Sequence, residues 1–189
     1  HLYEKYGPDC LQYLRGMFAF AIWDECEERL FLARDRLGQK PLFIRSTGDG
    51  FWFGSTIRAL LADPTVPAEP DLPAIREYLT YQYTPHPKTG FQDIEQLGPA
   101  EYAIVDTDGI RRQRYWSLSF ADQLDVSGHA LAGRLREELR EATRLRMRSD
   151  VPVGVFLSGG VDSSIVTGLM SDIAEEPVNT YSIGFDEQA

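Results

Sequence analysis

The sequence has only two cysteines, Cys10 and Cys26, in 189 residues. Two thiols cannot build a disulfide framework or a cysteine-rich metal cluster, and they favour reduced, buried or half-buried side chains in a cytoplasmic protein. No apolar run reaches the about 18–20 residues that cross a bilayer, so no membrane contact is expected. The formal net charge is -10, which argues against a nucleic-acid partner, although backbone amides can still bind a small anion.

The chain also lacks an initiator methionine and a signal-peptide pattern, since it begins His1-Leu2-Tyr3. Such a start is typical of an internal fragment, and we expect no function for His1. His86 lies in a proline-bounded loop and His129 near a helix start, so both are expected on the solvated surface. The sequence has no internal repeat, low-complexity tract or coiled-coil heptad.

The N-terminal part consists of short β-type runs separated by turn residues. The runs cover residues 18–23, 30–33, 42–44 and 51–53. Because most are apolar at consecutive positions, they predict an antiparallel meander that is covered on both faces. Asp71 then caps a predicted helix that extends to about Gln82. Two further strands, 101–105 and 110–115, are joined by Asp106-Thr107-Asp108-Gly109, a hairpin signal that completes a layered α+β domain.

The character of the chain changes after residues 117–126, where no periodicity is present and we place a domain boundary. Residues 127–148 carry Leu131, Leu135, Leu139 and Ala142 at helical spacing. Arginines interleaved with glutamates occupy the other positions, which favours a solvated helix face over a nucleic-acid site. A strand at 153–157, a glycine-rich turn, a second helix and a strand at 180–185 then predict a parallel strand–helix–strand unit.

The glycine-rich turn is the best-defined candidate site, and it reads Ser158-Gly159-Gly160-Val161-Asp162-Ser163-Ser164. We expect a buried strand before it and, after it, a helix with one apolar face. Two glycines permit positive φ and a close approach of the backbone to a ligand. Successive amides and the helix N-terminus favour anions in the same space. The three serine hydroxyls add donors, and Asp162 is the carboxylate positioned to hold a cation on bound phosphates.

Two other phosphate-binding motifs are excluded. The lysine that a Walker A loop requires is replaced by Gly160, and no G-x-G-x-x-G fingerprint is present. A loop without that lysine suits bound pyrophosphate better than γ-phosphate transfer. The alternative is a glycine-rich turn that merely connects a strand to a helix.

Residues 158–164 match the SGG-x-DSS motif of the PP-loop ATP-pyrophosphatases. Three further segments, and with them essentially the whole chain, resemble the glutamine-hydrolysing asparagine synthetases: Leu14-Arg15-Gly16-Met17-Phe18-Ala19-Phe20-Ala21, Arg34-Asp35-Arg36-Leu37-Gly38-Gln39-Lys40-Pro41-Leu42, and Ser149-Asp150-Val151-Pro152-Val153-Gly154. The resemblance implies the C-terminal part of an α+β glutaminase, N-terminal-nucleophile hydrolase-like with antiparallel sheets, at residues 1–118. The start of an α/β parallel-sheet PP-loop synthetase domain follows at residues 119–189.

The resemblance also implies a reaction, in which a ligase forms asparagine from aspartate and glutamine through an aspartyl-adenylate, releasing AMP and pyrophosphate. The implied partners are these small molecules with ATP and Mg²⁺, and a homodimer is left open. Leu157 and Ile183 would lie beside the adenine, which agrees with their places at the carboxyl ends of two parallel strands. Ser158, Gly159, Gly160, Val161, Asp162, Ser163 and Ser164 would surround the phosphates, with Asp162 on Mg²⁺. Met17 would line an ammonia tunnel, and a core methionine on a strand is its alternative.

The sequence departs from the family at several points. The nucleophilic N-terminal cysteine is absent, as is the upstream aspartate that holds the glutamine amine. Neither Cys10 nor Cys26 has a free α-amino group, so we assign no catalytic residue. The family's Ser-Glu pair appears as Ser55-Thr56. Rival functions are a synthetase of the same architecture with another acceptor, β-lactam synthetase-like or modifying a glycan or peptide, and a non-catalytic nucleotide-binding remnant.

We predict that this 189-residue chain by itself neither hydrolyses glutamine nor makes asparagine, because it has no N-terminal nucleophile. The measurement is glutamate release from glutamine by the purified chain against a boiled control. Enzyme-dependent release would show that another residue of the chain supplies the nucleophile.

Overall fold

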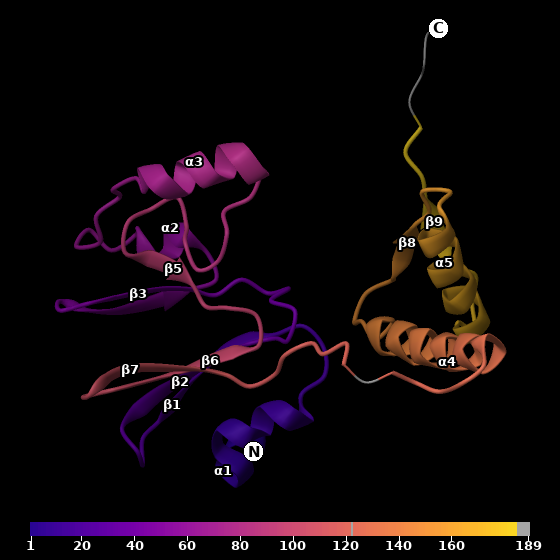
Figure 1. Cartoon of the computed structure of the whole chain (residues 1–189), viewed down its shortest axis with the longest axis horizontal. Coiled ribbons are helices and arrows are strands. Elements are labelled where there is room, and N and C mark those ends of the chain that lie inside the picture. The colour runs from indigo at the N-terminus through magenta and orange to yellow at the C-terminus, as the bar shows by residue number, and fades with distance from the viewer. Residues whose placement is uncertain (122, 185–189) are drawn as a thin grey trace, which may run out of the picture. The chain divides into compact units, whose positions relative to one another are not determined.

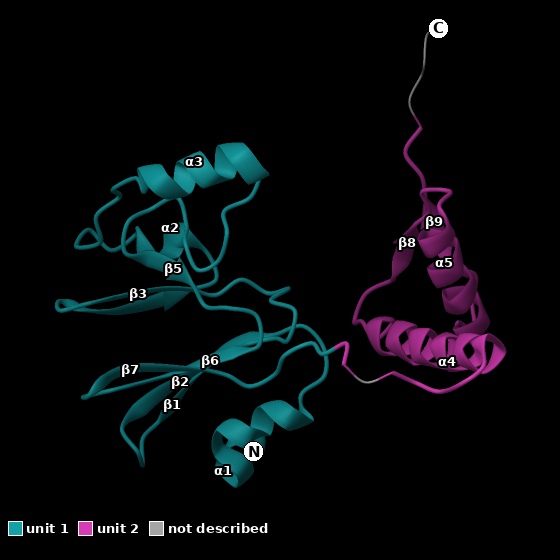
Figure 2. Cartoon of the chain, in the orientation of Figure 1, with its two compact units in different colours: residues 1–119 teal, residues 120–189 magenta. Residues whose placement is uncertain are grey.

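The computed structural model describes residues 1–121 and 123–184. The chain forms two compact units, His1–Ser119 and Phe120–Ala189, each with its own packing (Figure 2). The expected domain ranges, 1–118 and 119–189, stay a prediction. Within the described residues, no helix combines the length and apolar character that a membrane crossing requires.

Unit 1 contains two antiparallel sheets (Figure 1). The first has the order β1-β2-β6-β7 and the second the order β4-β3-β5. The strands are β1 (Ala19–Asp24), β2 (Arg29–Arg34), β3 (Phe43–Thr47), β4 (Gly50–Gly54), β5 (Ile94–Gln96), β6 (Glu101–Asp106) and β7 (Gly109–Arg114). The helical elements are α1 (Leu2–Tyr6), a 3₁₀ helix (Gly7–Tyr13), α2 (Ile57–Leu60) and α3 (Leu72–Tyr81).

The predicted antiparallel pairing and the hairpin at residues 106–109 are confirmed. The prediction that the first four runs form a single meander is wrong, however, because β1 and β2 belong to one sheet and β3 and β4 to the other. The loop between β2 and β3 carries the chain from one sheet to the other. The central position beside β2 is then taken by β6, from far along the chain.

The main core of unit 1 joins side chains from both sheets. Its buried members are Leu32, Leu42, Ile44, Leu97 and Ala103. On the opposite face of the first sheet, α1 and the 3₁₀ helix cover a second cluster, whose buried members are Cys10, Leu11, Phe31 and Ala33. Strand β2 is therefore buried on both faces, as its consecutive apolar residues predicted.

The same expectation is wrong for β1. Ala21 is exposed, and the side chain of Trp23 is 57% exposed. The physical reason is position in the sheet, since β1 lies at an edge with only β2 beside it. An edge strand is covered by fewer neighbours than a central strand of the same composition.

The helix starts in both units follow the chemistry of N-caps. The cap that the sequence predicted at Asp71 is confirmed, and its carboxylate accepts from Ala74 N at 3.0 Å. Thr56, where the sequence departs from the family that it resembles, caps α2 through its hydroxyl. That departure therefore has a local structural role. In unit 2, the hydroxyl of Ser127 accepts from Ala130 N at 3.3 Å.

A buried carboxylate, Asp35, organises the loop that follows β2. The side chain is 1% exposed and accepts four backbone N–H groups. The donors are Leu37 N at 3.1 Å, Gln39 N at 3.0 Å, Lys40 N at 2.9 Å and Phe18 N at 3.3 Å. Burial alone would raise the pKa of Asp35, but these donors outweigh it and hold the pKa below its usual value of 3.8.

The neighbouring Arg34 is 5% exposed, and its guanidinium satisfies two carbonyl groups of the same loop and one just past the end of β5. It donates to Lys40 O at 2.7 Å, Gly38 O at 2.5 Å and Leu97 O at 2.6 Å. Tyr115 donates its hydroxyl proton to Arg34 O at 2.8 Å, and burial raises the pKa of Tyr115 to about 12. The two charged residues thus tie the loop to both sheets and to the end of β7.

Unit 2 comprises α4 (Gly128–Arg146), β8 (Gly154–Phe156), α5 (Val161–Ile173) and β9 (Asn179–Tyr181). Strands β8 and β9 are parallel, which confirms the predicted strand–helix–strand unit. The strand expected at 180–185 ends earlier, at Tyr181, and Phe185 lies outside the described residues.

The expected burial of the strand before the glycine-rich turn is wrong. Phe156 is 75% exposed and Tyr181, its partner on β9, is 57% exposed. Leu131 and Leu135 of α4 are also exposed. The cause is that, among the described residues, this sheet has two strands, too few elements to cover both of its faces.

We predict that Asp35→Asn destabilises unit 1 by about 1–3 kcal/mol for each of the two N–H groups, Phe18 N and Lys40 N, that lose a carboxylate acceptor. The folded pKa is depressed, so this stability is present above the ordinary pKa of 3.8 and is lost as pH falls through the lower folded value. The measurement is urea unfolding followed by tryptophan fluorescence, since all three tryptophans lie in unit 1.

The matched control is Asp49→Asn, an exposed carboxylate in the turn between β3 and β4, which should change stability by less than about 0.5 kcal/mol. Equal destabilisation by the two variants at neutral pH would contradict the structural role given to Asp35.

Candidate functional site

The glycine-rich turn lies at the carboxyl end of β8 and leads directly into α5. One further ladder bond, from Leu157 N to Tyr181 O at 2.8 Å, extends the parallel pairing beyond the strand. The turn is therefore anchored at the edge where open α/β sheets bind ligands.

The two glycines of the turn have different conformations. Gly159 has φ +80, the left-handed region in which a side chain is strained. The expectation of positive φ is confirmed there but is wrong for Gly160, whose φ is -79. A Cβ on Gly160 would meet nothing closer than Ser158 Oγ at 3.6 Å. The fold of the chain therefore requires glycine only at position 159, and glycine at 160 leaves open space beside the backbone.

The N-terminus of α5 has no side-chain cap. Gly160 is the N-cap, and the first intrahelical bond runs from Ser164 N to Gly160 O at 3.1 Å. The N–H groups of the first turn and the positive end of the helix dipole are thus directed toward solvent beside Gly159. This arrangement suits an anion such as phosphate.

Two of the expected serine donors are committed within the turn. The hydroxyls of Ser163 and Ser164 both donate to Gly160 O, at 3.1 and 2.8 Å. Ser158 Oγ lies 3.0 Å from Ser163 Oγ, so these two side chains come together at the mouth of the loop. The serine hydroxyls therefore stabilise the turn itself. The backbone N–H groups are the donors that remain for a ligand.

Asp162 lies in the first turn of α5 with an exposed side chain. No group of three or more His, Cys, Asp or Glu ligands occurs within the described residues. A single hard carboxylate beside a bound phosphate would still suit Mg²⁺, which keeps several waters and takes one or two carboxylates plus phosphate oxygens.

The two residues expected beside the adenine lie where β8 and β9 end. Leu157 is half-buried, and Ile183 is 77% exposed. Between them Ser182 donates its hydroxyl proton to Leu157 O at 2.6 Å. The sequence reasoning missed Ser182, because a lone serine after a strand has no pattern that marks it.

Met17, the expected tunnel residue, belongs to unit 1 and precedes β1. Its side chain is 48% exposed, so the alternative of a core methionine on a strand is wrong. It borders an apolar cavity of about 520 Å³ that is lined by His1, Leu2, Tyr3, Cys10, Leu14, Arg15, Phe18, Phe20 and Ile22. Its role in a tunnel stays a prediction.

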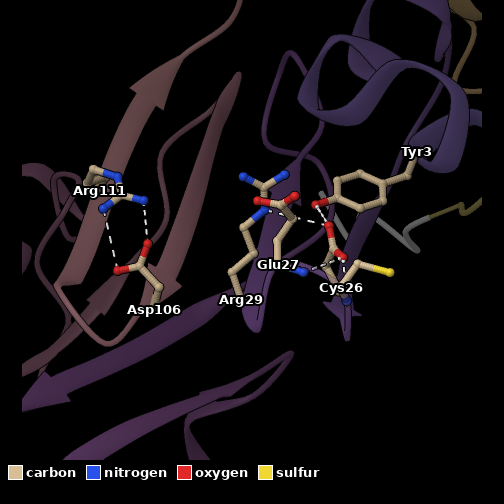
Figure 3. A network of polar contacts seen from close by, with 7 residues as sticks. Tyr3, Cys26, Glu27, Arg29, Asp106 and Arg111 are labelled. Atoms are coloured by element: carbon tan, nitrogen blue, oxygen red, sulfur yellow. Dashed lines mark hydrogen bonds and ion pairs between the residues drawn. The ribbon is translucent and has the colours of Figure 1, made fainter.

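A polar network at the turn between β1 and β2 has a structural explanation (Figure 3). The carboxylate of Asp24 accepts from Cys26 N and Glu27 N, each at 3.2 Å, and from Tyr3 Oη at 2.9 Å. The Tyr3 bond contributes most to holding the pKa of Asp24 below its ordinary value.

The cysteines are free as expected, but Cys26 is exposed in this turn, while only Cys10 is buried.

Comparison with known families assigns both parts of the chain. A family model described as a glutamine amidotransferase domain matches residues 1–116, and one described as asparagine synthase matches residues 134–189. The first match covers more than half of the chain.

Curated relatives match along nearly the whole chain. Asparagine synthetase [glutamine-hydrolyzing] 3 of Bacillus subtilis is 38% identical over 192 residues, covering 99% of this chain and 31% of the relative. Putative asparagine synthetase [glutamine-hydrolyzing] 2 of Methanocaldococcus jannaschii is 35% identical, covering 98% and 37%. Amidase chry2 of Gibberella zeae is 32% identical, covering 98% and 30%. The chain thus spans about a third of the length of these relatives.

We predict that alanine has unequal effects on stability at the two glycines. Gly159→Ala should cost about 1–2 kcal/mol because alanine is strained at positive φ. Gly160→Ala should cost less, at most about 1 kcal/mol, because its φ is ordinary and only the preference of an N-cap position for glycine over alanine is lost. Thermal unfolding by far-ultraviolet circular dichroism, which follows the helices, measures both. A larger loss for Gly160→Ala would overturn the assignment of these conformations.

Proposed function

We propose, because the chain belongs to the glutamine amidotransferase family and joins such a domain to an asparagine synthase segment, that the complete protein is a glutamine-hydrolysing asparagine synthetase. In the proposed reaction an aspartate carboxylate oxygen attacks the α-phosphorus of ATP and pyrophosphate leaves. Ammonia from glutamine then attacks the acyl carbon of the aspartyl-adenylate, and AMP leaves. No residue of this chain is proposed as the glutaminase nucleophile.

The observation that carries the proposal is the uncapped N-terminus of α5 beside Gly159 and Gly160. Its N–H groups offer a nest for the pyrophosphate leaving group without any lysine. Because the chain has a formal net charge of -10, the overall charge would repel the phosphates. The local positive potential at this helix N-terminus would attract them. The proposed ATP site comprises Leu157, the loop residues 158–164 and Ile183.

Asp162 is proposed to hold Mg²⁺ on the phosphates, which would neutralise charge that develops on the leaving group. The carboxylate is exposed at the head of α5, so it can reach a bound metal without disturbing the core. The proposed small-molecule partners and homodimer rest on the family, and the proposed cytoplasmic location also rests on the low cysteine content.

A second candidate function is a synthetase of the same architecture that modifies another acceptor. It is favoured by the relatives named amidases, Amidase chry2 and Amidase chyE, whose identities of 32% and 31% are close to those of the named synthetases. Pyrophosphate release by the complete protein with aspartate, compared with other carboxylates, distinguishes the two candidates.

We predict that Asp162→Asn in the complete protein lowers ATP-dependent pyrophosphate release about a hundredfold to a thousandfold, the usual range for losing one electrostatic contact to the transition state. Glutamine hydrolysis and the melting temperature should be unchanged, since the substitution is nearly isosteric. Asp172→Asn, also an exposed carboxylate on α5, is the matched control and should retain full activity. Near-wild-type release by Asp162→Asn would show that the role in ATP chemistry given to this carboxylate is wrong.

A further inference from the structure

The backbone hydrogen bonding between β8 and β9 ends where the proposed nucleotide site begins. Phe156 pairs with Tyr181, and Leu157 N donates to Tyr181 O at 2.8 Å. In a parallel ladder the next bond returns from the strand two residues further on, so Ile183 N would donate to Leu157 O. Within residues 1–121 and 123–184 that backbone bond is not formed.

A side-chain hydrogen bond to Leu157 O is formed instead of this backbone bond. Ser182 Oγ donates to Leu157 O at 2.6 Å. Serine hydroxyls that bond to nearby backbone offer the chain an alternative to the ladder, and here the alternative satisfies the carbonyl that would otherwise continue the sheet. The backbone pairing of the two strands ends at Leu157, whose carbonyl accepts this hydroxyl instead, and the backbone of Ile183 is left outside the ladder.

Ile183 is 77% exposed, so a ligand can reach this residue just beyond the end of β9. An N–H donor and a C=O acceptor of neighbouring peptide groups complement an adenine edge, which presents a ring-nitrogen acceptor beside an amino donor. The same backbone groups would be unsuitable if Ile183 N were bonded to Leu157 O.

We infer that Ser182 is a positioning residue for the nucleotide base: by capping Leu157 O it ends the ladder and keeps the backbone of Ile183 open to adenine. This inference rests on the proposed function, because it takes ATP as the ligand of the site. Ser182 itself touches no reacting atom. Its effect is on how tightly the base is bound and not on the transfer step.

The test uses the complete protein with three substitutions. Ser182→Ala removes the hydroxyl, and Ser182→Thr retains it. Ser171→Ala removes an exposed serine hydroxyl from α5, away from the loop, and serves as the control. AMP formation is measured against ATP concentration with aspartate and glutamine at saturation, and inorganic pyrophosphate is used as an inhibitor.

Ser182→Ala should raise KM for ATP about threefold to tenfold, the range that loss of one hydrogen bond gives, with kcat unchanged. The inhibition constant of pyrophosphate should stay at the wild-type value, because pyrophosphate contacts the loop and not the strand ends. Ser182→Thr should restore KM to near wild type, and Ser171→Ala should match wild type throughout.

An unchanged KM in Ser182→Ala overturns the inference. So does a fall in kcat and melting temperature without a change in KM, which would make the hydroxyl only a fold contact. A proportional weakening of pyrophosphate inhibition also overturns it, since the effect would then lie in the loop. If wild-type protein uses no ATP, the proposed function fails and this inference fails with it. If wild type uses ATP and Ser182→Ala equals it, only this inference fails.

Discussion

The buried carboxylate of Asp35 is the constraint on which the arrangement of unit 1 depends. Three of its four N–H donors lie within the loop between β2 and β3, and the fourth, Phe18 N, precedes β1. Arg34 meanwhile binds carbonyls of that loop and of Leu97, next to β5. A single pair of charged residues thus fixes where the chain leaves one sheet and enters the other. Neither charge needs a direct ionic partner, because backbone groups satisfy both.

Much of unit 1 could be predicted because its signals are local. Asp71 marks a helix start by its own hydrogen bond, and the turn at residues 106–109 closes with Asp106 accepting from Asp108 N at 3.0 Å. The division of strands between two sheets could not be predicted, since it depends on β6 pairing with β2 across a large separation in sequence. The exposure of Trp23 has the same origin. Composition identifies a strand, whereas its burial depends on how many strands lie beside it.

The candidate loop shows a similar division. The order of strand, glycines and helix predicted an anion site, and the uncapped helix start has the geometry expected. Which glycine carries the positive φ could not be read from the sequence, because Gly159 and Gly160 are chemically identical and only the path of the backbone distinguishes them. Ser182 was missed for a related reason. Its hydroxyl matters only because Leu157 O lies opposite it, and that proximity arises from the parallel register of β8 and β9.

The two units differ in how far their own packing supports them. Unit 1 has three clusters of buried side chains, whereas the buried hydrophobic side chains of unit 2, within the described residues, are Leu169 and Met170 on α5. Full burial of such a side chain is worth about 1.5–3 kcal/mol. A ligand that binds only the folded form adds about 2.7 kcal/mol at a concentration of about 100 times its Kd, which equals one more buried side chain. Because the loop belongs to this thinly packed unit, a bound nucleotide would act on the stability of α5 and the β8–β9 ladder as strongly as a member of the core. The proposed occupant of the loop would therefore contribute to the stability of unit 2 as well as to its chemistry.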